Sequence, residues 1–358
     1  MAPPDSMSAA PPSDNASPPP NRLAWVDLLR GLAVLGMVET HVVNVFLSSR
    51  FEDATWRSEL SFFNGLLAPT FLWIAGYIQG LAIRRAHQLH RPVVSVRRWQ
   101  RLGSVALIGY LLHIPWHLWG GGDFGLESWR IFLQVDVLPC LAVSLGILLL
   151  TGCLRNKAWF EGFTLAALVL VVVAAPFSPA WHTGFLPLDG YLNRTGGSLF
   201  PLFPWFGFCA AGCLMSRFEL NGIGWWVAAA LMAFVSPWLA PSPFSSLQPA
   251  FFIERLGWLL GVALIVKAVS RFTAPNWLQL AGRESLFIYV VHLVLLHSIP
   301  AGGGITWDKK IGQTFSPGTT AAVFFALTSV CLLLAWANEK RKVKVKALNA
   351  VGEPAPRS

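Results

Sequence analysis

The strongest constraint on this fold is a series of apolar stretches, each near the length that a helix needs to cross a bilayer. A spanning helix requires roughly 20 mainly apolar residues. Backbone polar groups in hydrocarbon must be paired within the chain, so such stretches predict helices rather than open strands. The ten stretches cover residues 26–47, 62–83, 102–119, 131–152, 161–176, 199–216, 223–240, 250–268, 278–299 and 318–338.

Composition supports lipid as the main solvent. The 358 residues are 54% hydrophobic and 13% charged, whereas soluble domains carry about 25% charged residues. The sequence therefore predicts an all-α, polytopic membrane helix bundle with about ten transmembrane helices, and it excludes a soluble globular protein.

The basic residues predict the orientation of the bundle. With ten spans, 20 of the 27 Lys and Arg residues fall on the face that holds both termini, and seven fall on the other. Cytoplasmic loops carry an excess of Lys and Arg, so we expect both termini in the cytoplasm. This placement also explains the net charge of +9 without a nucleic-acid partner.

Three regions are expected along the chain. Residues 1–22 are rich in Pro, Ser and Ala and predict a disordered tail rather than a cleaved signal peptide. Residues 23–338 form the membrane domain, and residues 339–358 form a basic cytoplasmic tail. The five cysteines show no metal-ligand spacing, so we expect neither a disulfide framework nor a metal.

The first apolar stretch is the richest in polar groups: Asp27, Arg30, Glu39, His41 and Asn44. Ionisable residues inside a membrane are costly and often functional. At 100° per residue, Arg30 and His41 lie about 20° apart on one stripe, separated by about 16 Å along the helix. Asp27 and Asn44 fall about 40° and 60° from His41, while Glu39 is on the other side and faces a neighbouring helix or the substrate cavity.

This stripe suits chemistry across a bilayer. Arg30, beside Asp27 at the cytoplasmic mouth, would meet an entering anion, and His41, deeper in the membrane, could take a proton from a nucleophile. The alternatives are a positive-inside anchor for Arg30 and a hydrogen-bonded structural role for the histidine.

A basic connection over residues 84–101 adds six arginines on the cytoplasmic side. Arg98 and Arg101 share one helix face, with Arg97 adjacent, and guanidinium groups bind phosphates through paired hydrogen bonds. These three predict a seat for a nucleotide-bearing donor such as acyl-CoA. Attraction to anionic lipid headgroups is the alternative, and it is the preferred interpretation for Arg84 and Arg85.

The ninth stretch carries two more histidines, His292 and His297. His292 could line the cavity of His41, orient its ring, or satisfy a core carbonyl group. His297 is placed nearer the outer surface.

The chain resembles the transmembrane acyltransferase superfamily, and within it bacterial proteins of the heparan-α-glucosaminide N-acetyltransferase catalytic-domain type. It also resembles the related acyltransferase-3 enzymes in the spacing of Arg30 and His41 and in the RxxR of Arg98 and Arg101. The blocks that carry the resemblance are Arg22–His41, Phe71–Arg85, Arg97–Arg101, Leu133–Val143, Phe200–Gly212 and Gly282–His292.

The resemblance implies an enzyme of the bacterial cytoplasmic (inner) membrane that moves an acyl group, expected to be acetyl, from cytoplasmic acyl-CoA to an outer glycan or glycolipid. It implies His41, Asp27 and Arg30 as active-site residues and Arg97, Arg98 and Arg101 on the donor side. The substrate cavity is then expected to include Asn44, Glu39, His292 and Trp205.

One departure concerns the outer loop after the first span. The animal enzymes of this type have an important histidine there, and SSRFEDATWRSELSFF contains none. His41 is then the best candidate base.

Two other functions remain open. A proton- or ion-coupled transporter would also use intramembrane His, Arg and Glu, although the sequence shows no internal repeat and no matched pair of broken helices. An acyltransferase-like scaffold without activity is the third. The oligomeric state is open, with a homodimer as one alternative.

Overall fold

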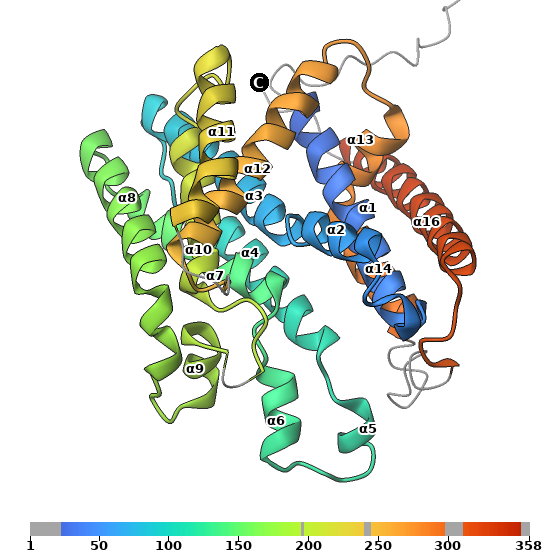
Figure 1. Cartoon of the computed structure of the whole chain (residues 1–358). Coiled ribbons are helices and arrows are strands. Elements are labelled where there is room, and N and C mark those ends of the chain that lie inside the picture. Colours follow the sequence, from blue (N-terminus) through green and yellow to red (C-terminus); the bar gives the residue numbers. More distant parts are fainter. Residues whose placement is uncertain (1–22, 195–196, 240–244, 298–310, 352–358) are drawn as a thin grey trace, which may run out of the picture.

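In the computed structural model the chain is a bundle of helices (Figure 1), described for residues 23–194, 197–239, 245–297 and 311–351. The structure is 78% helix, and within these ranges the only β pairing is an isolated bridge between Leu47 and Phe315. The all-α fold is therefore confirmed. The predicted disorder of residues 1–22 lies outside the described residues.

Each of the ten predicted stretches overlaps a helix, and the ends differ by several residues in some of them. Their bounds are α1 (Ala24–Phe46), α3 (Leu67–Gln88), α4 (Val96–Leu112), α7 (Val137–Thr151), α8 (Lys157–Ala174), α10 (Leu202–Met215), α11 (Ile223–Val235), α12 (Pro249–Val269), α14 (Ser285–His297) and α16 (Pro317–Val351). The shorter helices are α2 (Thr55–Asn64), α5 (Trp116–Trp119), α6 (Leu126–Leu133), α9 (Leu186–Leu192) and α13 (Asn276–Arg283), with 3₁₀ turns η1 (Ser49–Phe51), η2 (Ala175–Ala180) and η3 (Ser236–Leu239).

By length and composition, four of the described helical segments could cross a membrane, or up to six if each bent pair is one span. The bent pairs are α6 with α7, at 58°, and α13 with α14, at 81°. The helices α10 and α11 are apolar but shorter. An integral membrane bundle is supported, and the number ten stays a prediction.

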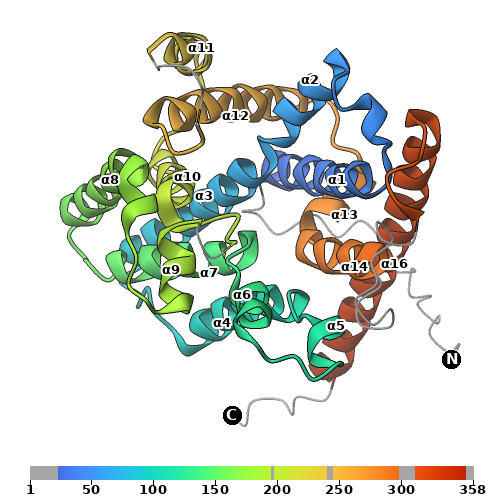
Figure 2. The ribbon, with the colours of Figure 1, turned by 60° about the horizontal axis from the view of Figure 1, so that its bottom comes forward.

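Contacts between helix ends show how the chain runs back and forth. Ser48 donates its backbone N–H to Phe315 O (3.0 Å), so the end of α1 meets the start of α16. At the opposite end, Arg283 pairs with Glu339 (2.6 Å). The helices α1, α13, α14 and α16 therefore lie side by side (Figure 2). The cytoplasmic location of the termini stays a prediction.

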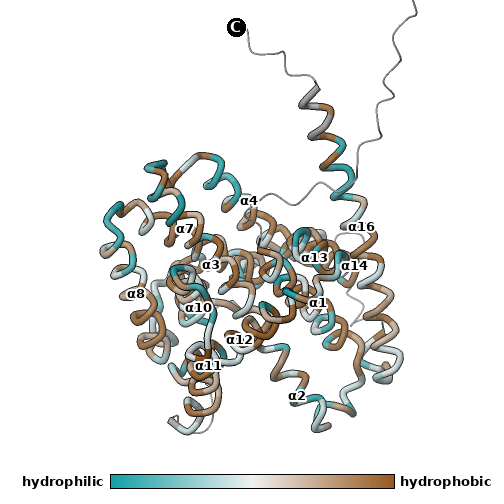
Figure 3. Tube along the Cα trace, turned by 90° about the horizontal axis from the view of Figure 1, so that it is seen from above, coloured by the Kyte–Doolittle hydropathy of each residue, from teal (hydrophilic) through white to brown (hydrophobic). Residues whose placement is uncertain are grey.

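The predicted boundary at residue 338 falls inside a helix. Residues 339–351 continue α16 to Val351, and this hydrophilic end extends away from the bundle (Figure 3). Lys342 is anchored there by Glu284, whose carboxylate oxygens each lie 2.7 Å from its amine.

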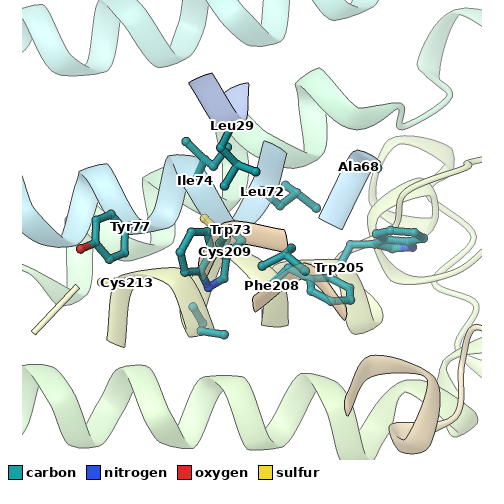
Figure 4. Close-up of a cluster of buried hydrophobic side chains, with 14 of the residues drawn as sticks. Leu29, Ala68, Leu72, Trp73, Ile74, Tyr77, Trp205, Phe208, Cys209 and Cys213 are labelled. Atoms are coloured by element: carbon teal, nitrogen blue, oxygen red, sulfur yellow. The ribbon is translucent and has the colours of Figure 1, made fainter. Parts of the chain in front are cut away.

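Glycines allow a close contact between the helices α3 and α10. A Cβ added to Gly76 would collide with the backbone carbonyl of Cys209, and one added to Gly212 would collide with that of Trp73. Small residues at such crossings let helices approach in membranes, where packing rather than hydrophobic exclusion drives association. The aromatic core of Figure 4, including Trp73 and Trp205, surrounds this crossing.

We expect Gly76→Leu to destabilise the bundle by about 3 kcal/mol or more, because its neighbour is backbone that cannot repack. Unfolding of the purified protein, titrated with SDS, measures this. Gly103→Leu is the matched control, since Gly103 is an exposed helical glycine with no atom within 4 Å of an added Cβ. Equal stability of the two variants would contradict the packing role.

Candidate active site

Three histidines from two helices meet inside the bundle. The ring of His41, on α1, lies 5.3 Å from the ring of His292 and 6.2 Å from that of His297, both on α14, measured between centroids. His292 is fully buried and His41 half-buried. The structure thus brings His41 together with both histidines of the ninth predicted stretch.

Hydrogen bonding fixes which nitrogen of His292 is protonated. Nδ1 lies 2.9 Å from the carbonyl oxygen of Ile288, which can only accept, so Nδ1 donates. In the neutral ring Nε2 is then an acceptor, and within the described structure it is buried without a hydrogen-bond partner. Buried polar atoms without a hydrogen-bond partner are rare in folded proteins, and each costs about 1–3 kcal/mol of stability. Where a protein retains such an atom, a functional role is one of the usual reasons.

A carboxylate completes this polar cluster. Asp136 stands at the break between α6 and α7, and its Oδ2 accepts a hydrogen bond from the Tyr289 hydroxyl (3.0 Å). His113, at the end of α4, places Nε2 3.8 Å from the same oxygen. Tyr289 in turn packs edge-on against His292, with ring centroids 5.5 Å apart. Four helices therefore supply one titratable cluster.

Sequence reasoning missed Asp136, His113 and Tyr289. Asp136 is a carboxylate within the predicted span 131–152 and within a block that carries the family resemblance. An intramembrane carboxylate is by default a functional candidate. That signal alone would have identified it.

A large cavity opens among the helix ends that the charge bias places in the cytoplasm. Its volume is about 1010 Å³. The wall is strongly basic and includes few acidic groups. It is formed by Leu23, Val26, Asp27, Ile78, Leu81, Ala82, Arg84, Arg85, His87, Gln88, Arg155, Lys157, Phe160, Ser216 and Arg217.

Glu161 organises part of this wall. Its two carboxylate oxygens pair with Arg84 and Arg217, each at 2.6 Å. Arg84 also donates to Ser216 Oγ and to the Cys213 carbonyl, both at 3.3 Å. One carboxylate thus holds two guanidinium groups at the cavity, whereas the sequence favoured lipid headgroups for Arg84 and Arg85.

The three arginines predicted for the donor side lie elsewhere. Arg97 and Arg101 are exposed on the first turns of α4, and Arg98 donates to the Val93 carbonyl (2.5 Å). None of the three is among the residues of the cavity wall. The structure brings Asp27 to the cavity and leaves Arg30 half-buried on the same helix.

The remaining predicted cavity residues occupy two other places. Asn44 accepts a hydrogen bond from Arg57 (3.0 Å), and Glu39 interacts with Asn64 and Arg57, so both face α2. Trp205 packs in the aromatic core, with its ring 4.7 Å from that of Phe200.

Comparison with protein families identifies the group to which this arrangement belongs. The family model for the catalytic domain of heparan-α-glucosaminide N-acetyltransferase matches residues 22–234, more than half of the chain. The chain belongs to this family. The comparison with curated proteins gives no match.

The heparan-α-glucosaminide N-acetyltransferase family is a family of transferases, which confirms the predicted resemblance. The matched region contains His41, Asp136 and the whole cavity wall. It ends before α14, so Tyr289 and His292 lie beyond it. The geometry of the described residues joins them to the matched part.

Proposed function

We propose that this chain is a membrane acetyltransferase. It would move an acetyl group from cytoplasmic acetyl-CoA to a hydroxyl or amine of a glycan or glycolipid on the other side of the bacterial inner membrane. The family match supports the transferase class, and the observation that carries the proposal is the clustering of His41 with His292, His297 and Asp136 inside the bundle.

In this proposal the donor binds in the basic cavity. Arg155, Lys157 and Arg217 would bind its phosphates, since guanidinium and ammonium groups are the usual partners of phosphate oxygens. Asp27 and Arg30 would stand at the entrance from the cavity to the interior. His41 lies about 21 Å further along α1 from Asp27 at 1.5 Å per residue, so the thioester arm would follow this helix.

The proposed reaction is direct transfer with His41 as general base. His41 takes the proton of the acceptor hydroxyl or amine while the acceptor oxygen or nitrogen bonds to the thioester carbonyl carbon. The carbon–sulfur bond breaks, and the departing CoA thiolate receives the proton from His41. An imidazole suits both steps because its ordinary pKa lies near neutrality.

Acetyl transfer by the purified protein in liposomes tests the proposal. Radiolabelled acetyl-CoA is supplied with an envelope glycan extract, and free CoA and labelled glycan are measured. We expect equal amounts of both, and their absence in empty liposomes. Mass spectrometry of the host's envelope glycans should show an acetyl group that is lost when the gene is deleted.

A proton-coupled transporter is the second candidate, and one observation favours it. The sequence predicted no matched pair of broken helices, but two bent pairs occur, α6–α7 and α13–α14, and their second helices meet at Asp136 and Tyr289. Discontinuous helices are typical of transporter sites. Proton uptake into liposomes without acetyl-CoA would favour this function and count against acetyl transfer.

A further inference from the structure

Asp136 stands where an aspartate ordinarily caps its own helix. It is the residue preceding α7, but its side chain makes no capping hydrogen bond to that helix. Capping would use the carboxylate to satisfy free backbone N–H groups at the helix start. The side chain, only 15% exposed, instead accepts the Tyr289 hydroxyl from α14. Its orientation therefore serves a contact across the bundle.

A second contact comes from the opposite side of the bundle. His113, at the end of α4, places Nε2 3.8 Å from Asp136 Oδ2, while its Nδ1 donates to the Gly109 carbonyl at 2.8 Å. Nε2 of the neutral ring is an acceptor, so an ion pair with Asp136 forms only when the His113 ring is protonated. Asp136 thus lies between α4 and α14, and the hydrogen bond from Tyr289 orients its carboxylate.

The surroundings of His41 show where that charge acts. Within the described residues, the rings of His292 and His297 from α14 lie 5.3 and 6.2 Å from that of His41, and Asp136, which precedes α7, interacts with His41 electrostatically. Glu39, two residues earlier on α1, interacts with Arg57 and Asn64 instead. A positive charge formed on His41 would stand inside the bundle next to two other imidazoles. Asp136 is the carboxylate of this cluster, and a negative charge favours a positive charge near it.

We propose that Asp136 is a positioning residue that stabilises the imidazolium formed at His41 during acetyl transfer. This inference rests on the function proposed above. Asp136 exchanges no proton in the reaction: the acceptor's proton goes to His41 and then to the CoA thiolate. The carboxylate offsets the transient charge, and the hydrogen bond from Tyr289 keeps it in position.

The test is the pH dependence of kcat/KM for Asp136→Asn. Loss of the negative charge makes it easier for His41 to stay neutral, so the acidic limb of the profile should move about one unit to lower pH. The plateau should fall about tenfold, because the same loss weakens the base and raises the energy of the imidazolium. A purely structural defect would lower the plateau and leave the limb in place.

Asp123→Asn is the matched control, an exposed carboxylate on the loop between α5 and α6, and it should keep both limb and plateau. Tyr289→Phe removes the hydrogen bond and keeps the ring, so kcat should fall with little change in KM for acetyl-CoA. This variant decides the question if Asp136→Asn does not fold.

If folded Asp136→Asn keeps the acidic limb of the wild-type pH profile, or if Tyr289→Phe keeps the wild-type kcat, the inference is overturned. If wild type itself transfers no acetyl group, it is the proposed function that fails.

Discussion

His41→Ala should lower kcat for acetyl transfer by about 10²–10⁴-fold, the usual contribution of a general base. KM for acetyl-CoA should change little, because the basic cavity lies about 21 Å away along α1. The two effects separate chemistry from donor binding. Steady-state release of CoA thiol, measured with the acceptor saturating, gives both constants.

Two controls make this result specific to the site. His182→Ala removes an exposed histidine outside the cluster and should leave kcat unchanged. Binding of CoA, followed as a rise in the unfolding temperature, should be equal in His41→Ala and wild type, since a ligand stabilises the state that binds it. A His41→Ala protein with wild-type kcat would exclude this residue as the base.

Local periodicity was enough to predict part of the site. The polar residues of α1 form a pattern that depends only on the 3.6-residue repeat, so His41 could be selected without knowledge of any partner. The resemblance around Gly282–His292 added His292. These two histidines, 251 positions apart in the chain, lie with their rings 5.3 Å apart.

The rest of the cluster depends on the way the helices pack. Asp136 and Tyr289 are 153 residues apart, and their contact requires both spans to bend next to them. Neither bend has a strong local signal, since no proline falls in Leu280–His297 and Pro139 lies within the first turn of α7. Only the polarity of Asp136 within an apolar stretch pointed to it.

The arginines near the cavity show the same limit of prediction from sequence. In the sequence, the arginines of 84–101 form one group. Within it, Arg98 and Arg101 were selected because their three-residue spacing places them on one helix face. In the structure α3 ends with Arg84 and Arg85 turned to the cavity, while α4 begins outside it. The group is divided by a turn at His90, a residue with positive φ (53°). Spacing alone could not separate these two sets.

Charge reversal of the cavity wall therefore discriminates between the two donor sites. We expect Arg155→Glu with Lys157→Glu to raise KM for acetyl-CoA about 100-fold, or about 2.7 kcal/mol, with kcat at saturating donor nearly unchanged. The loss of two charge-assisted hydrogen bonds to phosphate, at about 1.5–3 kcal/mol each, is large enough to produce a rise of at least that size. Both residues are exposed, and Lys157 begins α8, where a glutamate suits the helix dipole.

Arg97→Glu with Arg101→Glu is the matched pair, because it also reverses two exposed charges near a helix start, on α4. If the phosphates bind in the cavity, the α4 pair keeps the wild-type KM for acetyl-CoA. Raising the salt concentration should also weaken donor binding to wild type more than to the cavity variant. The reverse outcome, a large rise in KM for the α4 pair alone, would place the phosphates on Arg97 and Arg101. It would also leave the cavity without a role in donor binding.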